Sequence, residues 1–343
     1  MKTLAAIIVE QNKPLELMEL EVPNLEEGQV LVEVKYTGIC RTQVNEIKGY
    51  KGKDHFLPHT LGHEGSGVVL EVGAKVTKVK KGDHVVLTWI KGEGLEYFGT
   101  QYQAVGQKVN SGPISTFLKH AVISENRVIS IGKDIPLREA ALFGCAIPTG
   151  AGIVYNELAL EEGATVAIFG LGGIGLSSLL AARMKGAKQI IAVDREQEKL
   201  DLAKALGATE TLLFNTEGFV EAIHDMTEGK GVDYSIEAAG NKLVMETAFE
   251  VIRPHGKCVL AGNVPHGTRI SCDPFDFIKG KQLVGTWGGN VKPDQDIPLF
   301  LSEFMKDRRG FDKLISHEIP LEEINTGIEM AETGKAARIF IRL

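Results

Sequence analysis

Cysteine is scarce in this sequence, with four residues in 343, and that scarcity excludes a scaffold built on disulfide bonds. Runs of basic residues are missing and the net charge is −7, so neither nucleic acid nor an anionic membrane is expected as a partner. No apolar stretch is long enough to cross a bilayer. These absences favour a soluble protein of a reducing compartment, the cytoplasm, in which some cysteines serve as metal ligands.

Two segments lack features that would otherwise suggest a signal peptide or a second zinc site. The apolar start of the chain, residues 1–9, is short and is followed by Glu10 without a small-residue cleavage site. It therefore predicts a first β-strand and not a signal peptide. The segment Ile90–Pro113 is rich in Gly, Lys, Gln and Tyr but contains no cysteine, so we expect a long excursion without a cysteine-based zinc site.

The stretch Thr165–Asp194 carries the strongest pattern that is present. An apolar run at 166–169 predicts a strand buried on both faces of a parallel sheet, and helical spacing follows a glycine-rich turn. A second apolar run ends at Asp194, 19 residues beyond Gly175. Such glycines let the backbone approach a pyrophosphate at a helix N-terminus, and a terminal Asp accepts hydrogen bonds from ribose. An ordinary glycine-rich β-α-β turn is the alternative. The predicted dinucleotide-binding residues are Gly170, Gly172, Gly173, Ile174, Gly175 and Asp194.

The periodicity divides the chain into two domains. Up to about residue 88, short apolar runs alternate with turn residues, which predicts a mostly β domain. From about residue 150, strands alternate with helices, which predicts a doubly wound parallel sheet. We expect residues 1–146 and 288–343 to form a catalytic domain and residues 147–287 a nucleotide-binding domain, with the active site in the cleft between them.

The predicted strands and helices are as follows. In the first domain the strands are Leu4–Val9, Leu15–Leu20, Val30–Tyr36, Gly67–Val72 and Val85–Thr88, and a short helical stretch at 137–143 ends in a turn at 144–150. In the second, strands at 165–169, 189–193, 211–214, 232–237, 257–262 and 282–287 alternate with helices near 173–185, 197–206, 217–226 and 242–252, two of which end at Gly207 and Pro254.

Soft metal ligands occur at three points in or beside the first domain. Cys40 follows a predicted strand, His63 and Glu64 precede another, and Cys145 lies just upstream of the nucleotide-binding stretch. Taken singly, each has a plain explanation, since a cysteine is often a small buried apolar residue and a histidine often a satisfied core residue. Strand ends and loops are, however, where metal sites are commonly assembled.

Together these motifs make the chain resemble the zinc-dependent medium-chain alcohol and polyol dehydrogenases, nearly from end to end. The resemblance is most specific in the string from Gly62-His63-Glu64 to Gly73, and Gly38–Thr42, Cys145–Gly150 and Gly170–Gly175 with Asp194 add to it. It implies a GroES-like catalytic domain, a Rossmann domain, NAD as cofactor and one catalytic zinc held by Cys40, His63 and Cys145. Two thiolates and one imidazole suit zinc and leave a fourth position open.

The resemblance also implies roles for single residues. Thr42 begins the relay that removes the alcohol proton, and Glu64 lies near the zinc as a neighbouring carboxylate or an occasional ligand. Further matches are Arg41 and Arg338 to the cofactor phosphates, Thr149 to the nicotinamide, Lys199 to the adenosine ribose, and Trp89 and Phe117 to the substrate pocket. Together with Trp287, these two rings suggest that the pocket is lined by aromatic residues. The alternative is a solvated surface charge for each cation and plain core for Trp89 and Phe117.

Three departures from the family pattern matter. The cysteine-free excursion at 90–113 replaces a four-cysteine structural zinc lobe, so we expect one zinc per chain. Asn45 stands where several members have a histidine that completes the proton relay, which leaves the exit route of the proton open. Gln43 stands where an acidic partner of the ligand histidine is common; an amide still orients His63 but supplies no negative charge.

The sequence thus predicts reversible oxidation of an alcohol to an aldehyde or ketone, with hydride transfer to NAD. Asp194 favours NAD over NADP, because a 2′-phosphate would face a like charge, whereas Arg195 would welcome that phosphate. A polyol or sugar dehydrogenase of the sorbitol or threonine type is the alternative. The three soft ligands disfavour a zinc-free quinone or enoyl reductase and a non-catalytic nucleotide-binding protein. The aromatic pocket favours simple or aromatic alcohols over sugars, and the choice between homodimer and homotetramer stays open.

Overall fold

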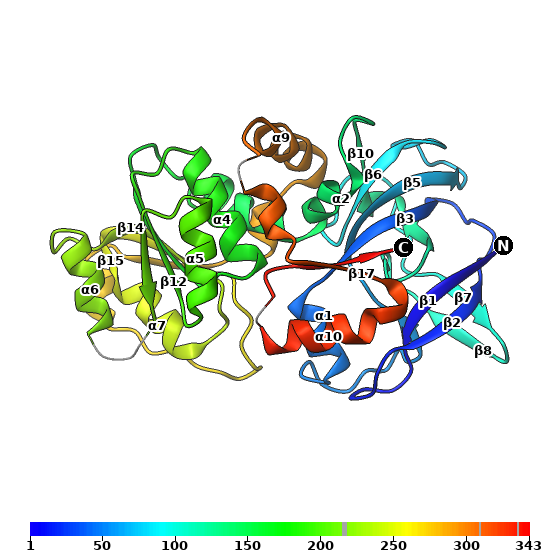
Figure 1. The fold of residues 1–343 in the computed structure, drawn as a ribbon, viewed down its shortest axis with the longest axis horizontal. Coiled ribbons are helices and arrows are strands. Elements are labelled where there is room, and N and C mark those ends of the chain that lie inside the picture. Colours follow the sequence, from blue (N-terminus) through cyan, green and yellow to red (C-terminus); the bar gives the residue numbers. More distant parts are fainter. Residues whose placement is uncertain (215–217, 309, 335) are drawn as a thin grey trace. The chain divides into compact units, whose positions relative to one another are not determined.

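The computed structural model describes residues 1–214, 218–308, 310–334 and 336–343, which divide into two compact units (Figure 1). Unit 1 comprises residues 1–145, 292–305 and 315–343, and unit 2 comprises residues 146–291 and 306–314.

The boundary differs from the expected one at three places. Residue 146 and residues 288–291 lie with unit 2, although we expected them in the catalytic domain, and so do residues 306–314, which are the largest difference. Two contacts explain the placement of this last segment. Asp307 pairs with Arg183 at 3.1 Å, and Gly310 lies so close to Leu206 that a Cβ atom on it would be 2.3 Å from that side chain.

Unit 1 is built mostly of β-strands, as its short alternating apolar runs predict. The strands are β1 (Lys2–Ile8), β2 (Glu16–Glu21), β3 (Gln29–Ile39), β4 (His59–Thr60), β5 (Glu64–Val72), β6 (His84–Thr88), β7 (Gln101–Ala104), β8 (Gln107–Asn110), β9 (His120–Ser124), β10 (Val128–Ile131), β17 (His317–Pro320) and β18 (Ile339–Arg342). Among the described residues, β1-β2-β7-β8-β4 close a barrel, and a second sheet has the order β10-β6-β5-β3-β18-β17, with β9 also paired to β3.

The helices of unit 1 are α1 (Arg41–Ile47), η1 (Glu125–Arg127), α2 (Leu137–Ala140), η2 (Ala141–Gly144), α9 (Pro293–Lys306, whose last residue belongs to unit 2), η6 (Leu321–Glu323) and α10 (Ile324–Thr333). They are short except for two near the C-terminus, α9 with 14 residues and α10 with 10.

Strand β3 brings the ends of three strands together. Its Thr37 pairs with Gly65 of β5, and its Ile39 pairs with Ile339 of β18. Cys40 directly follows β3, Glu64 begins β5, and Arg338 directly precedes β18. The sheet register therefore gathers residues from the start and the end of the chain at one place.

Unit 2 is a doubly wound sheet of the expected kind. Its strands are β11 (Thr165–Phe169), β12 (Gln189–Asp194), β13 (Glu210–Leu213), β14 (Val232–Glu237), β15 (Ile252–Leu260) and β16 (Gln282–Gly285). They pair in parallel in the order β13-β12-β11-β14-β15-β16 within the described part of the chain. The helices are α3 (Ala146–Gly152), η3 (Ile153–Glu157), α4 (Gly173–Met184), α5 (Gln197–Leu206), α6 (Phe219–Met226), α7 (Lys242–Glu250), α8 (Pro274–Ile278), η4 (Gly288–Asn290) and η5 (Phe311–Leu314). The fold class predicted from the sequence is confirmed.

Four local expectations need comment. The expected turn at 144–150 is largely helix α3, and the excursion after β6 contains the hairpin β7–β8. Pro254 does not close a helix: α7 ends at Glu250, and Pro254 lies inside β15. The helix expected near 217–226 begins at Phe219, and its residue 217 lies outside the described residues.

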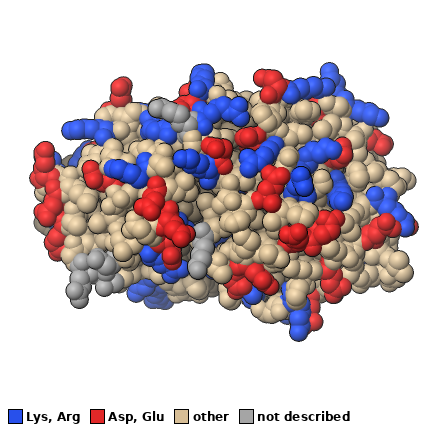
Figure 2. Space-filling model, viewed as in Figure 1, with Lys and Arg blue, Asp and Glu red and all other residues tan. Residues whose placement is uncertain are grey.

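The surface carries both signs of charge. Figure 2 shows Lys and Arg side chains interspersed with Asp and Glu over the visible face. In the part of the chain that the structure describes, no single helix is both long and apolar enough to cross a membrane.

Candidate metal and nucleotide sites

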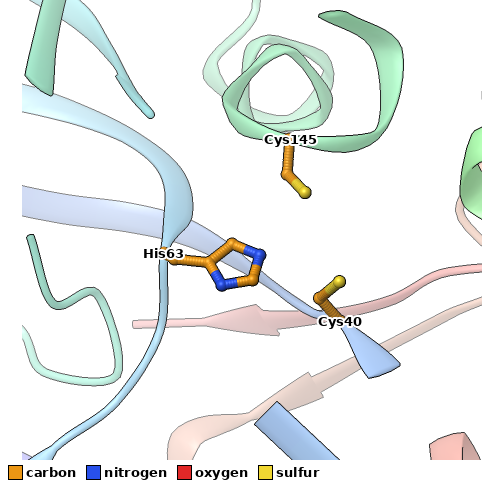
Figure 3. Close-up of side chains that lie close together, drawn as sticks. All are labelled: Cys40, His63 and Cys145. Carbon is orange, nitrogen blue, oxygen red and sulfur yellow. The ribbon is translucent and has the colours of Figure 1, made fainter. Parts of the chain in front are cut away.

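Cys40, His63 and Cys145 meet in unit 1, as the sequence predicts. Cys40 caps helix α1, His63 directly precedes β5, and Cys145 directly follows η2. One ligand atom from each of the three side chains lies within 4.8 Å of the other two, and Figure 3 shows the side chains pointing toward one another. The sheet around β3 therefore assembles two sulfurs and one imidazole from three distant points of the chain.

The arrangement fits a zinc ion. His63 Nε2 is buried and has no hydrogen-bond partner among the described residues. A buried ring nitrogen with an unused lone pair, next to two sulfurs, forms with them the donor set that zinc requires. These three residues would hold the metal, with the fourth position open to water or substrate.

Gln43 links two of the ligands, which confirms its expected role toward His63. The side chain is buried, its Nε2 contacts His63 Nδ1, and its Oε1 accepts a hydrogen bond from the Cys40 backbone N–H at 2.9 Å. A hydrogen bond to the second ring nitrogen, the one that does not face the metal position, fixes the orientation of a metal-binding histidine. The link to Cys40 was not foreseen, although the spacing of three residues at a helix start is a capping-box signal.

The two thiols differ in their tendency to ionise. A hydrogen bond from the Cys145 thiol holds the pKa of Cys40 well below its usual range, against the effect of burial, and the positive charge of Arg338 adds to this shift. The same hydrogen bond and burial raise the pKa of Cys145 well above its usual value. Cys40 is therefore the first of the two to become a thiolate.

Glu64 and Arg338 form a buried pair beside the ligands. Glu64 is fully buried and Arg338 is nearly so, and Arg338 Nη2 contacts Glu64 Oε1. Burial lowers the pKa of the Arg338 guanidinium, but the opposing charge of Glu64 outweighs burial and raises it, so the guanidinium stays charged. We expected Arg338 at a cofactor phosphate. The contact to Glu64 escaped sequence reasoning because the two residues are 274 positions apart.

Helix α1 carries the remaining candidates of the reaction chemistry. Thr42 and Asn45 are both half-buried and three residues apart, so they are neighbours on the helix surface. Arg41 is exposed, and its Nη1 donates to the carbonyl oxygens of Ala331 and Glu332 at 3.3 and 2.7 Å, at the end of α10.

The two aromatic candidates of unit 1 have different environments. The Trp89 ring is half-buried, and its centroid lies 6.4 Å from that of His63. The Phe117 ring is fully buried in the hydrophobic cluster that includes Ala6 and Leu61. A fully buried ring offers no surface to a substrate, so Phe117 has the environment of a core residue.

The glycine-rich turn of unit 2 has the expected form. Gly170 has a φ of +88°, and a Cβ atom on Gly175 would lie 1.9 Å from the Gly170 oxygen, so both positions require glycine. A Cβ atom on Gly172 would meet nothing within 4 Å, and α4 begins at the next residue. The turn therefore presents open backbone at a helix N-terminus, as phosphate binding requires.

Asp194 also holds the turn in place. Its Oδ2 accepts the Leu171 N–H at 2.7 Å, and its Oδ1 accepts the N–H groups of Arg195 and Glu196 at 2.8 and 3.1 Å. A carboxylate has about four acceptor positions. One position is therefore left for a ribose hydroxyl.

The other candidates of unit 2 lie in varied environments. Lys199 Nζ is 4.0 Å from Asp194 Oδ2, and the Arg195 side chain is 79% exposed. Thr149 is buried in α3, and its hydroxyl has no hydrogen-bond partner among the described residues. Trp287 is 82% exposed.

A second group of possible metal ligands, Glu46, Asp54 and His59, has a simpler explanation. His59 Nε2 lies 2.7 Å from Asp54 Oδ2, which is a hydrogen-bond distance. Two ligands of one tetrahedral zinc ion lie about 3.3 Å apart. The spacing favours a proton shared between these two groups over a metal ion.

Fold and site together define a metal-dependent oxidoreductase with a dinucleotide cofactor. The model of the zinc-binding dehydrogenase family matches residues 173–306, and that of the alcohol dehydrogenase GroES-like domain matches residues 26–133. The S-(hydroxymethyl)glutathione dehydrogenase of Paracoccus denitrificans is 34% identical over an alignment of 377 positions, gaps included, that covers 99% of this chain and all of that protein. The chain belongs to the zinc-dependent medium-chain alcohol dehydrogenase family.

Solved structures agree with this assignment. A zinc-binding alcohol dehydrogenase domain protein of Burkholderia ambifaria is 32% identical, with a TM-score of 0.89 over 100% of this chain and 99% of that one. The benzyl alcohol dehydrogenase of Acinetobacter calcoaceticus is 29% identical, with the same TM-score and coverage. The protein is therefore a zinc-dependent enzyme that transfers a hydride between an alcohol and NAD.

Proposed function

We propose that this enzyme oxidises simple or aromatic alcohols, with one zinc ion per chain held by Cys40, His63 and Cys145. The observation that carries the proposal is the unpartnered Nε2 of His63, which faces two sulfurs while the Trp89 ring lies next to the imidazole. An aromatic ring such as that of Trp89 beside the metal position favours apolar substrates, because polyols need a polar partner for each hydroxyl group. Similarity to a benzyl alcohol dehydrogenase supports the same substrate class.

The zinc ion supplies a Lewis acid that polarises the alcohol oxygen and favours loss of its proton. Thr42 would relay that proton: its hydroxyl oxygen accepts it while its own hydroxyl proton passes on, because a hydroxyl group accepts and donates hydrogen bonds at once. Asn45 is the next polar residue on the same face of α1. Its amide neither gains nor loses a proton near neutral pH, so the proton passes to solvent beyond Thr42. Glu64, fixed by Arg338, balances charge beside the ligands and serves as an occasional ligand.

When bound, the nicotinamide of NAD would supply the acceptor for the hydride of the carbinol carbon, and that chemistry belongs to the cofactor. In the proposal Gly170, Gly172, Gly173, Ile174 and Gly175 receive the pyrophosphate, Asp194 and Lys199 the ribose, and Thr149 the nicotinamide. The exposed Arg41 is a further phosphate contact, as is Arg338, because a guanidinium has five donors and the Glu64 contact uses one. Trp287, whose ring is exposed on unit 2, is kept in the proposal as a further contact of an aromatic substrate. Phe117 is left out of it because it is fully buried.

Two other substrate classes remain as alternatives. S-(hydroxymethyl)glutathione is the substrate in the name of relatives that are 33–34% identical over the whole chain. A polyol, of the sorbitol or threonine type of dehydrogenase, is the second. We further propose that the enzyme is a homodimer or homotetramer of the cytoplasm, in keeping with its few cysteines, all of which are free.

Purified enzyme with NAD tests the substrate class. Benzyl alcohol, ethanol, sorbitol, threonine and S-(hydroxymethyl)glutathione are compared by the absorbance of reduced cofactor. Benzyl alcohol with the highest kcat/KM supports the proposal, and a higher value for sorbitol, threonine or the glutathione adduct rejects it in favour of that class. Metal analysis of the same sample should give one zinc per chain, and a Cys145→Ala enzyme that keeps its metal and turnover would contradict the ligand set.

A further inference from the structure

Residues 89–97 have neither helix nor strand, yet they are tied to the short turn η1 at several points. The Gly92 N–H donates to the Asn126 carbonyl oxygen at 2.8 Å, and the Asn126 N–H donates to the Leu95 oxygen at 3.2 Å. The Tyr97 N–H donates to Ser124 Oγ at 2.8 Å, directly before η1. One three-residue turn thus fixes the path of the segment that follows β6.

The buried carboxylate of Glu125 fixes this turn through hydrogen bonds from neighbouring backbone amides. Its side chain is 1% exposed, and its Oε1 accepts the N–H groups of Thr77 and Lys78 at 2.6 and 3.0 Å. Its Oε2 accepts the Leu95 N–H at 2.7 Å. Hydrogen bonds from backbone amides to a buried carboxylate are among the strong ones, so η1 is a rigid support.

Arg127, the last residue of η1, reaches the segment at its beginning. Its Nη1 donates to the Trp89 carbonyl oxygen at 2.8 Å, and its Nη2 lies 3.3 Å from Glu96 Oε1. The Arg127 side chain is only 12% exposed, so water does not readily replace these contacts. The planar guanidinium holds two acceptors at a fixed spacing, which the single ammonium of a lysine cannot do.

Trp89 stands between this support and the metal ligands. Its ring lies beside His63, and His63 is itself fixed by Gln43. The distance between the Trp89 ring and the three candidate metal ligands therefore depends on where the Trp89 backbone is held. We propose that Arg127 is a positioning residue that sets Trp89 beside His63 and thereby determines which alcohols the site accepts.

The inference rests on the proposal that Trp89 lines the substrate pocket, and a spectroscopic readout tests it independently of turnover. Trp89 and Trp287 are the two tryptophans of the chain. In a Trp287→Phe parent, emission comes from Trp89 alone. Arg127→Met should move this emission to longer wavelength, because a ring that is no longer held gains contact with water. Arg127→Lys should give a smaller shift. Arg138→Met is the control, since it also removes an arginine of unit 1 that has an ion pair with a glutamate, Glu318 at 2.8 Å, but none of the described contacts of Arg138 involves Trp89.

Kinetics in the chain with both tryptophans complete the test. Arg127→Met should raise KM for benzyl alcohol about 10-fold, which is the size of one well-placed aromatic contact, and should change kcat much less. Ethanol is too small to contact the Trp89 ring, so its KM should stay within about 2-fold of the value for the natural enzyme. Zinc content should not change, because Arg127 contacts none of the three ligands among its described hydrogen bonds.

Three outcomes decide between the possibilities. An unshifted Trp89 emission in Arg127→Met overturns the inference. Equal losses for both alcohols, or loss of zinc, also overturn it, because they show a general structural role. If Trp89→Ala leaves all KM values unchanged, the pocket proposal itself fails, whatever Arg127 does.

Discussion

At the scale of single residues, Thr42 separates chemistry from binding. It lies two residues after Cys40, and its hydroxyl group is the proposed start of the proton path. Positioned proton transfer contributes about 10²–10⁴-fold to a rate. Thr42→Val keeps the shape and removes the hydroxyl, so we expect kcat/KM for alcohol oxidation to fall by about this factor, with zinc and NAD still bound.

Thr42→Ser is the control and should keep most of the activity. Steady-state kinetics, metal analysis and cofactor titration measure the three quantities. Near-normal turnover of the valine variant would leave Thr42 with a packing role only.

Asp194 decides the choice of cofactor. A 2′-phosphate would face its carboxylate, and the resulting repulsion should make kcat/KM for NAD higher than for NADP by on the order of 10²-fold. Arg195 has a 79% exposed side chain whose Nε lies 3.6 Å from Glu196 Oε1, so it would exchange this exposed ion pair for one with that phosphate. Arg195→Ala should therefore widen the preference for NAD. Comparing both cofactors in both proteins tests this, and equal kcat/KM values in the natural enzyme would show that Arg195 dominates.

The cluster of Cys40, His63 and Cys145 was predictable from the sequence, whereas its surroundings were predictable only in part. Cys40, His63 and Cys145 stand in motifs whose local spacing is informative. The Glu64–Arg338 pair depends on the pairing of β3 with β18, which no local pattern reveals. The burial of Phe117 likewise depends on a hydrophobic cluster whose residues, from Ala6 to Ile341, are far apart in the sequence.

At the scale of elements, helix α3 shows where local patterns fail. Pro148, Gly150 and Gly152 are typical of turns, so sequence reasoning placed a turn there. The glycines instead serve close packing: a Cβ atom on Gly150 would lie 2.6 Å from the Ile174 oxygen of α4, and one on Gly152 would lie 2.4 Å from the Gly289 oxygen. Tertiary packing, and not intrinsic propensity, makes this helix. Helices with apolar periodicity, such as α4 and α5, were predicted to within about a residue.

This packing gives a direct prediction. Gly150→Ala should lower the free energy of unfolding by about 1–3 kcal/mol, because the added methyl group meets backbone atoms of α4 that do not yield. Gly172→Ala is the matched control, since its Cβ atom meets nothing within 4 Å. It should leave stability nearly unchanged and weaken NAD binding by blocking the approach of the pyrophosphate. Denaturant unfolding and cofactor titration provide the measurements; similar stabilities of the two variants would speak against tight α3–α4 packing.

At the scale of the whole molecule, stability should fall in acid partly through Glu125. Burial opposes ionisation of this carboxyl, but hydrogen bonds from the backbone of Leu95, Thr77 and Lys78 outweigh burial and hold its pKa below the usual value of 4.5. A carboxyl whose pKa is lower in the folded protein stabilises the fold above its unfolded pKa, and this contribution is lost as pH falls through the folded pKa.

Glu125→Gln should therefore be less stable than the natural enzyme at pH 7 and should lose less stability on acidification below about pH 4.5. Urea unfolding at a series of pH values measures both effects. Glu19→Gln, at an exposed partner of Lys2, is the control. Parallel stability curves for the Glu125 variant and the natural enzyme would show that the carboxylate hydrogen bonds contribute little.

The pairing of β18 with β3 has a consequence for the order of events during synthesis. Glu64 and Arg338 are separated by 274 residues. At a translation rate of about 5–20 residues per second, a ribosome needs roughly 14–55 seconds to add them. Once residue 145 has been added, the nascent chain carries all three soft ligands, while Arg338, the counter-charge of Glu64, and the strand that follows it do not yet exist. The middle of the chain, residues 146–291, emerges within the same interval, so its parallel sheet has time to fold while the catalytic half waits for its last strand.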